Sequence, residues 1–190
     1  APASTAAAPG RLEGVMRVLR ADGRWPEVEP SPAGRDDLLR AHTPEHVVSI
    51  EENPKLYAMA ALAAGGAIQA ARLAVEGQAA FACVRPPGHH AGRSSTWGYC
   101  AFSNVAVALL KLREEGRIQS AFLLDFDAHT GDGTIDVLRG WPAAHILNPY
   151  AETAREYLAL VEAHLRNLPD VDIVAVSAGF DSYVHDVGGK

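Results

Sequence analysis

Short apolar runs alternate with helical segments through the second half of the chain. The runs cover residues 79–84, 120–126, 143–147 and 171–177, and residues 105–115 and 151–168 between them have helical spacing. Continuous apolar runs that alternate with helices are typical of parallel strands buried on both faces. The sequence therefore predicts an α/β fold with a central parallel sheet.

The first half of the chain is predicted to be helical. Residues 11–21 have helical spacing, residues 22–36 form a loop, and Thr43 precedes Pro44 as an N-cap precedes a first helical residue. Residues 55–76 are rich in alanine and predict one long, buried helix, in which two adjacent glycines mark close packing. We find no internal repeat and expect residues 1–190 to form a single domain.

The composition limits the classes of function. With 48% hydrophobic and 21% charged residues, the chain resembles ordinary globular proteins. A net charge of −6 argues against a nucleic-acid-binding protein, which needs a basic face. The longest apolar run, residues 58–68, is too short to span a bilayer, so no membrane partner is expected. Two cysteines without a CxxC pair, Cys83 and Cys100, fit a reducing, cytoplasmic compartment.

Chemically active side chains follow three of the four predicted strands. His89 and His90 follow the first, DFDAHTGDG (residues 125–133) overlaps the end of the second, and Asp181 follows the last. Ligands of parallel sheets bind at the carboxyl ends of the strands, so these residues are expected to converge. A cap, a surface loop or a turn would explain each feature alone, but not their joint occurrence at successive strand ends.

The spacing of DFDAH predicts a metal site. Asp125, Asp127 and His129 share parity, so an extended chain directs them to one face. Asp127 and His129 can ligate one ion, and Asp181 can supply a third ligand. Two carboxylates and an imidazole leave an open position for water, as a catalytic zinc site requires. Bound zinc lowers the pKa of that water to about 7.

The adjacent histidines need partners that orient their rings. Asp125 and Asp132 are the spare carboxylates, and a histidine–aspartate hydrogen bond is the common arrangement. An ion, a water and two oriented imidazoles can hydrolyse an unactivated amide. His42 and His46 are interpreted instead as capping and packing residues.

Four segments resemble zinc-dependent histone deacetylases and acetylpolyamine amidohydrolases, in that family's order. They are RPPGHHA (residues 85–91), WGYCAFSNVAVA (97–108), DFDAHTGDGT (125–134) and SAGFDSY (177–183). The short stretch between residues 134 and 150 is more similar to compact prokaryotic members. The resemblance implies the three-layer arginase/deacetylase fold, incomplete at its C-terminal side.

The resemblance also implies roles for individual residues. Asp127, His129 and Asp181 would hold zinc. His90, paired with Asp132, would be the general base, and His89, paired with Asp125, would help to protonate the leaving amine. The tunnel for the acylated side chain would be lined by Gly98, Tyr99 and Tyr150. A potassium ion near Asp125 is implied as a structural cofactor, and the implied substrates are acetylated lysine in a peptide or protein, or an acetylpolyamine.

Two departures from the family pattern leave alternatives open. Thr130 stands where the family often has a second histidine, and the family's transition-state tyrosine is expected beyond residue 190. One alternative is therefore a truncated or degenerate chain that binds acylated ligands without catalysis. Another is a binuclear manganese ureohydrolase, although Gly131 stands where that class needs an aspartate. The oligomeric state is not predicted.

Overall fold

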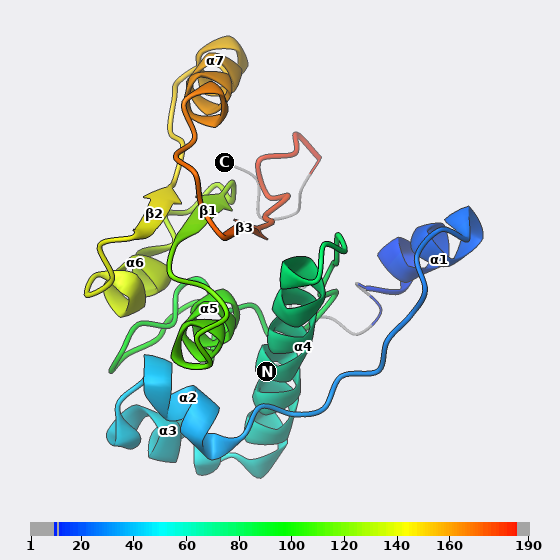
Figure 1. The fold of residues 1–190 in the computed structure, drawn as a ribbon. Helices are drawn as coiled ribbons and strands as arrows, with labels where there is room; N and C mark the ends of the chain where they lie inside the picture. The colour runs from blue at the N-terminus through cyan, green and yellow to red at the C-terminus, as the bar shows by residue number, and fades with distance from the viewer. Residues whose placement is uncertain (1–9, 11, 186–190) are drawn as a thin grey trace.

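The computed structural model describes residue 10 and residues 12–185 (Figure 1). Helices come first in the chain, and strands alternate with helices afterwards. In order, the elements are α1 (Glu13–Asp22), α2 (Arg35–Ala41), α3 (Pro44–Glu51), α4 (Pro54–Val75), α5 (Asn104–Glu114), β1 (Ala121–Asp125), α6 (Asp132–Leu138), β2 (Ala144–Leu147), α7 (Ala154–Arg166) and β3 (Ile173–Ser177).

The strands form a parallel sheet in the order β2-β1-β3. Leu123 on β1 pairs with Ile146 on β2 and with Ala175 on β3. Parallel strands place their carboxyl ends at one edge of the sheet, and the loops after β1 and β3 leave from that edge. The α/β class and the parallel sheet predicted from the sequence are confirmed.

One face of the sheet packs against α4 and α5, which lie side by side beneath it (Figure 1). Leu123 and Ile173 on this face are almost completely buried. Gly65 allows α4 to approach the N-terminal loop, because a Cβ there would lie 1.9 Å from the Ser31 carbonyl oxygen. The close packing predicted for the two glycines is therefore confirmed.

The opposite face of the sheet is more open, and beside β1 and β2 it forms one wall of a groove whose other wall includes residues of α7. Phe122 is buried there and lines an open groove with Ala163 of α7. Along β3, by contrast, Val174 and Val176 point to this face and are half exposed. None of the residues of α7 is fully buried.

The prediction of a strand at residues 79–84 is wrong. Strands need neighbours for their backbone hydrogen bonds, and within residues 12–185 this segment has none. Val84 lies instead against α4, where its side chain faces Gly66. Two short helices, α2 and α6, were not predicted, because seven residues give too little periodicity to recognise.

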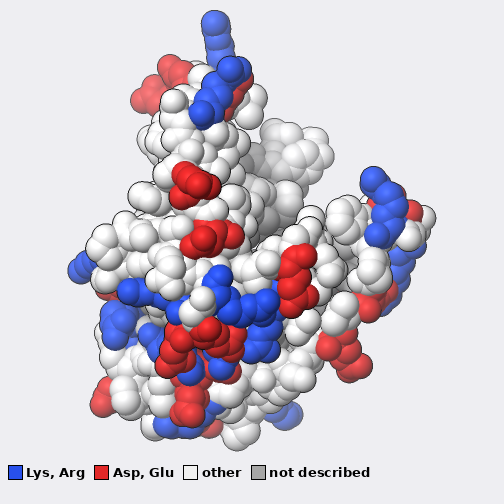
Figure 2. All heavy atoms as spheres, viewed as in Figure 1, with Lys and Arg blue, Asp and Glu red and all other residues white. Residues whose placement is uncertain are grey.

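Charged side chains of both signs gather beneath the sheet, over α2 and α5 (Figure 2). Asp37 of α2 accepts from Arg40 at 2.8 Å and from Lys111 at 2.9 Å. Arg40 also pairs with Glu114, so the same group of charges spans both helices. These interactions join α2 to α5 around a partly buried carboxylate.

Helix α4 is long and apolar enough, by length and composition alone, to cross a membrane. It also packs against α5 and presents buried alanines to the core, as core helices of folded domains do. Its 22 residues exceed the run considered in the sequence analysis. The absence of a membrane partner stays a prediction.

Candidate metal and catalytic site

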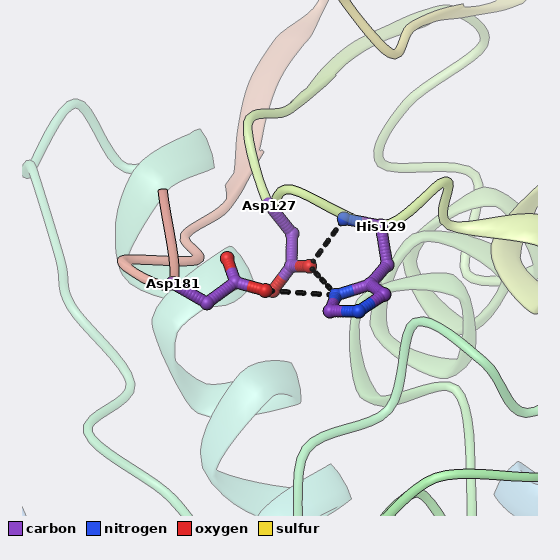
Figure 3. Close-up of side chains that lie close together, drawn as sticks. All are labelled: Asp127, His129 and Asp181. Atoms are coloured by element: carbon purple, nitrogen blue, oxygen red, sulfur yellow. Dashed lines mark hydrogen bonds and ion pairs between the residues drawn. The ribbon is translucent and has the colours of Figure 1, made fainter. Parts of the chain in front are cut away.

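Three potential metal ligands meet beyond the carboxyl ends of β1 and β3 (Figure 3). Asp127 and His129 lie in the turn after β1, and Asp181 lies in the turn after β3. His129 Nδ1 is 3.0 Å from Asp127 Oδ1 and 2.8 Å from Asp181 Oδ2. One ligand atom from each residue lies within 4.8 Å of the others. The structure thus brings together the three residues that the sequence singled out.

The donors suit a divalent cation. Burial raises the pKa of Asp181, but hydrogen bonds, first that from the Ala128 N–H at 2.9 Å, outweigh burial and lower it. An ionised carboxylate beside that of Asp127 is stabilised by positive charge. Two oxygens and one imidazole nitrogen form a set that zinc accepts, with room for water.

Glycines allow the backbone to approach the carboxylates of the site. A Cβ at Gly179 would lie 2.2 Å from Asp127 Oδ2, and a Cβ at Gly131 would lie 2.2 Å from Asp125 Oδ2. Both contacts are far shorter than any real Cβ contact. The glycines of SAGFD and HTGDG are thus required by space at the site.

His89 is oriented by Asp125. The His89 Nδ1 atom lies 3.2 Å from Asp125 Oδ2, and Asp125 Oδ1 accepts from the Asp127 N–H at 3.2 Å. Asp125 is buried, so its charge is little screened. Burial lowers the pKa of His89, but the hydrogen bond to Asp125 and nearby carboxylates outweigh burial, so the pKa is raised.

His90 is oriented by Asp132, the first residue of α6. His90 Nδ1 and Asp132 Oδ1 are 2.7 Å apart. Burial lowers the pKa of His90 and outweighs the opposing hydrogen bond to Asp132, so the net shift is downward. Gly133 brings α6 against this segment, because a Cβ there would lie 2.4 Å from the backbone of Ala91. Both predicted histidine–aspartate pairs are thus present.

Trp97 joins this group, although the sequence analysis assigned it no role. Its ring stacks on that of His90 with centroids 3.5 Å apart, and its Nε1–H donates to Asp132 Oδ2 at 2.9 Å. The signal available in the sequence was an aromatic residue directly before Gly98, in a segment already tied to the site.

His42 anchors the loop that carries Trp97. Its Nδ1 lies 2.7 Å from the Gly92 carbonyl oxygen, and its Nε2 accepts from the Ser103 N–H at 3.0 Å. His46 Nε2 lies 2.8 Å from the carbonyl oxygen of Ala101 in the same loop. Thr43 caps α3 through the His46 N–H, as predicted. Both histidines are buried and pack together, and they also shape the site.

Of the three predicted tunnel residues, Gly98 lies in contact with the site. Gly98 lies close to His90, since a Cβ there would be 3.2 Å from His90 Cδ2. Tyr99 and Tyr150 are both largely exposed. The tunnel role of all three residues stays a prediction.

The chain is similar in sequence to proteins of one known family. The sequence profile of the histone deacetylase domain matches residues 5–157. A probable deacetylase of Methanothermobacter thermautotrophicus is 33% identical over 144 residues, and one of Archaeoglobus fulgidus is 36% identical over 148 residues. Each alignment covers 67% of this chain but only 44% and 41% of the relative. The chain thus spans less than half the length of these relatives.

Two further comparisons are with a named deacetylase and with a solved structure. A polyamine deacetylase of Danio rerio, HDAC10, is 29% identical over 158 residues, covering 70% of this chain and 23% of that protein. The crystal structure of the HDA15 HD domain superposes with a TM-score of 0.81 at 24% identity, covering 94% of this chain and 69% of that one. At this identity the superposition shows a shared fold. The profile match and the shared fold together place this chain in the histone deacetylase domain family.

Proposed function

We propose that this protein is a zinc-dependent amidohydrolase that removes an acetyl group from an amine. The observation that carries the proposal is the convergence of Asp127, His129 and Asp181 beside two imidazoles that are each oriented by a carboxylate. Few other functions need three metal-binding donors next to two oriented proton-transfer groups. Membership of the deacetylase family supports the same conclusion.

The metal would supply Lewis acidity, which polarises a carbonyl group and makes water nucleophilic at neutral pH. Asp132 occupies His90 Nδ1, which leaves Nε2 to accept a proton from the attacking water. His89, held through Nδ1 by Asp125, would stabilise charge and pass a proton to the departing amine. We assign these two roles from the pairing and from the family resemblance.

The substrates we propose are acetylated lysine in a peptide or protein and acetylated polyamines. The relatives include proteins named as histone deacetylases and as polyamine deacetylases. In both substrate classes an aliphatic chain carries the acetylated nitrogen, and an aromatic ring such as that of Tyr99 would flank this chain. Gly98 and Tyr150 complete the proposed binding residues.

The remaining features of the proposal concern environment and ions. Cys83 and Cys100 are both free thiols, which supports a reducing, cytoplasmic location. Burial raises the pKa of the Cys100 thiol to about 11, so it is a poor nucleophile and a poor metal ligand. We retain potassium near Asp125 as a proposed structural ion.

Removing the imidazole of His129 tests the proposal most directly. We expect His129→Ala to lose the bound zinc, measured by elemental analysis after dialysis, and to lose zinc-dependent deacetylation of an acetyl-lysine peptide and of an acetylpolyamine. The exposed His145 provides the matched control, because His145→Ala also deletes an imidazole but should keep one zinc per chain. Full deacetylation by metal-free His129→Ala would refute the proposal.

The same measurements separate the alternatives. Two manganese ions per chain would favour a ureohydrolase, but the described residues contain a single cluster of three potential ligands. One zinc per chain without turnover of either substrate would favour a non-catalytic binder of acylated ligands.

A further inference from the structure

We propose that Trp97 is a positioning residue that fixes the His90–Asp132 pair for proton transfer. The inference rests on the proposed function, because it assigns Trp97 a part in the same reaction. Trp97 acts on both members of the pair: its ring covers the imidazole and its N–H holds the carboxylate.

The stack fixes the plane of the His90 ring. Trp97 and His90 have ring centroids 3.5 Å apart and an interplanar angle of 29°, and the His89 ring lies on His90 with centroids 3.9 Å apart. A ring in contact with two aromatic neighbours cannot rotate about its side-chain bonds without losing both contacts. The stack with Trp97 also shields the imidazole from water.

The indole N–H fixes the carboxylate. Asp132 has a side chain that is 53% exposed, so without a partner its second oxygen would be free to turn toward water. Trp97 Nε1–H donates to Oδ2 at 2.9 Å while Oδ1 is 2.7 Å from His90 Nδ1. With one oxygen held by each ring, the carboxylate cannot turn away from His90 without breaking one of these hydrogen bonds.

The local backbone is built to bring Trp97 into this place. Gly98 has a φ of 63°, a left-handed conformation that reverses the chain directly after the tryptophan. The Cys100 N–H donates to the Trp97 carbonyl at 3.4 Å, and the Thr96 hydroxyl donates to the Cys100 carbonyl at 2.9 Å. The His90 N–H donates to Cys100 Sγ at 3.4 Å, which ties the turn to the histidine that it covers.

The first test separates the two contacts that Trp97 makes. Trp97→Phe keeps an aromatic ring but removes the N–H, whereas Trp97→Leu removes both. We expect Trp97→Phe to lower kcat roughly tenfold with KM changed less than about twofold, and Trp97→Leu to lower kcat further. The matched control is Trp25→Phe: Trp25 is exposed and its Nε1–H also donates to an aspartate, Asp22, at 2.7 Å, but it lies outside the site.

A double-mutant cycle tests whether Trp97 acts through Asp132. Once Asp132→Ala has removed the carboxylate, Trp97→Phe should cause no further loss of kcat. A merely structural role would instead give independent, multiplying losses, and that result would overturn the proposal. An equal loss in the Trp25→Phe control would overturn it as well.

A measurement without substrate keeps the proposal separate from the enzymatic function. The His90 Nδ1 proton, observed by NMR, should exchange with water several-fold faster in Trp97→Phe than in the unsubstituted protein and in Trp25→Phe. Unchanged exchange in Trp97→Phe would overturn the inference whether or not the protein deacetylates. Absence of zinc-dependent turnover in the unsubstituted protein would count against the proposed function alone.

Discussion

The sheet face that carries Leu123 packs against α4 and α5, whereas the face that carries Val176 is largely open. Leu123 is buried together with most of the apolar core, but Val176 is 52% exposed. Helix α5 on this side is joined further to α2 by the ion pairs around Asp37. The two faces have similar apolar sequences, so their difference lies in the packing that surrounds them.

This difference indicates where the fold derives its stability. Buried apolar area is the dominant stabilising contribution, and the described residues bury it mainly between the sheet and α4–α5. The site lies at the edge shared by both faces, beyond the strand ends. Its geometry is therefore supported from the well-packed side, through the loops held by His42 and His46.

The largest expected effect comes from truncating one residue on each face. Leu123→Ala should lower the free energy of unfolding by about 2–5 kcal/mol, since it leaves a cavity in close-packed surroundings. Val176→Ala should cost less than about 1 kcal/mol, since half of this side chain already meets water. Urea denaturation measures both values, and equal losses would show that the faces do not differ as described.

A smaller effect should come from acid, through His42. The pKa of His42 is lowered from 6.5 to about 4, mainly by burial, which is partly opposed by the hydrogen bond to Gly92 and assisted by the charges of His46 and Arg93. The unfolded chain therefore binds a proton at a pH where the folded chain does not. The stability from neutral His42 is complete above pH 6.5 and falls between pH 6.5 and about 4, by up to about 3 kcal/mol.

Denaturation midpoints measured across that range would test this effect of His42. His42→Gln, which stays neutral, should lose less stability on acidification than the unsubstituted protein. His145→Asn, at an exposed position, controls for the loss of an imidazole as such. An identical pH slope in His42→Gln and the unsubstituted protein would contradict the burial argument.

The smallest effect should come from the ion pairs beneath the sheet. Burial raises the pKa of Asp37, but the hydrogen bond from Lys111 and further interactions outweigh burial and lower it. Its contribution is therefore present above the usual carboxyl pKa and lost as pH falls through the lowered value. Asp37→Asn should cost about 1 kcal/mol at neutral pH, and less in high salt. Glu27→Gln, which breaks a fully exposed pair with Arg20, should have no measurable effect.

Much of the fold was readable because the sequence signals were local. The alanine-rich helix, the Thr43 cap and three of the four apolar runs all appear where predicted. The prediction of a strand at residues 79–84 was wrong because a strand depends on a neighbouring strand, which apolar composition does not reveal. Helices α2 and α6 were not predicted because seven residues complete only about two turns, too few to show a helical pattern.

The site was readable to the extent that its residues follow strand ends. The alternating spacing of residues and the positions of the strand ends predicted that Asp127, His129 and Asp181 come together. The family resemblance paired each histidine with its aspartate. Trp97 escaped because its contacts depend on a left-handed turn at Gly98. His42 anchors a loop by bonding to backbone atoms some fifty residues away in the sequence. Such a contact cannot be predicted from the spacing of residues.

The carboxylate of Asp181 connects two turns, besides being a candidate metal ligand. One oxygen accepts from the Ala128 backbone N–H and the other lies beside the His129 ring. These two contacts hold the turn after β3 against the turn after β1. Deleting this side chain would loosen the turn after β3, although β3 itself stays paired with β1, at the same time as it removed a donor. Loss of zinc in an Asp181 variant could therefore come from the missing ligand or from the loosened turn. Substitution of His129 leaves the hydrogen bond between Ala128 and Asp181 in place.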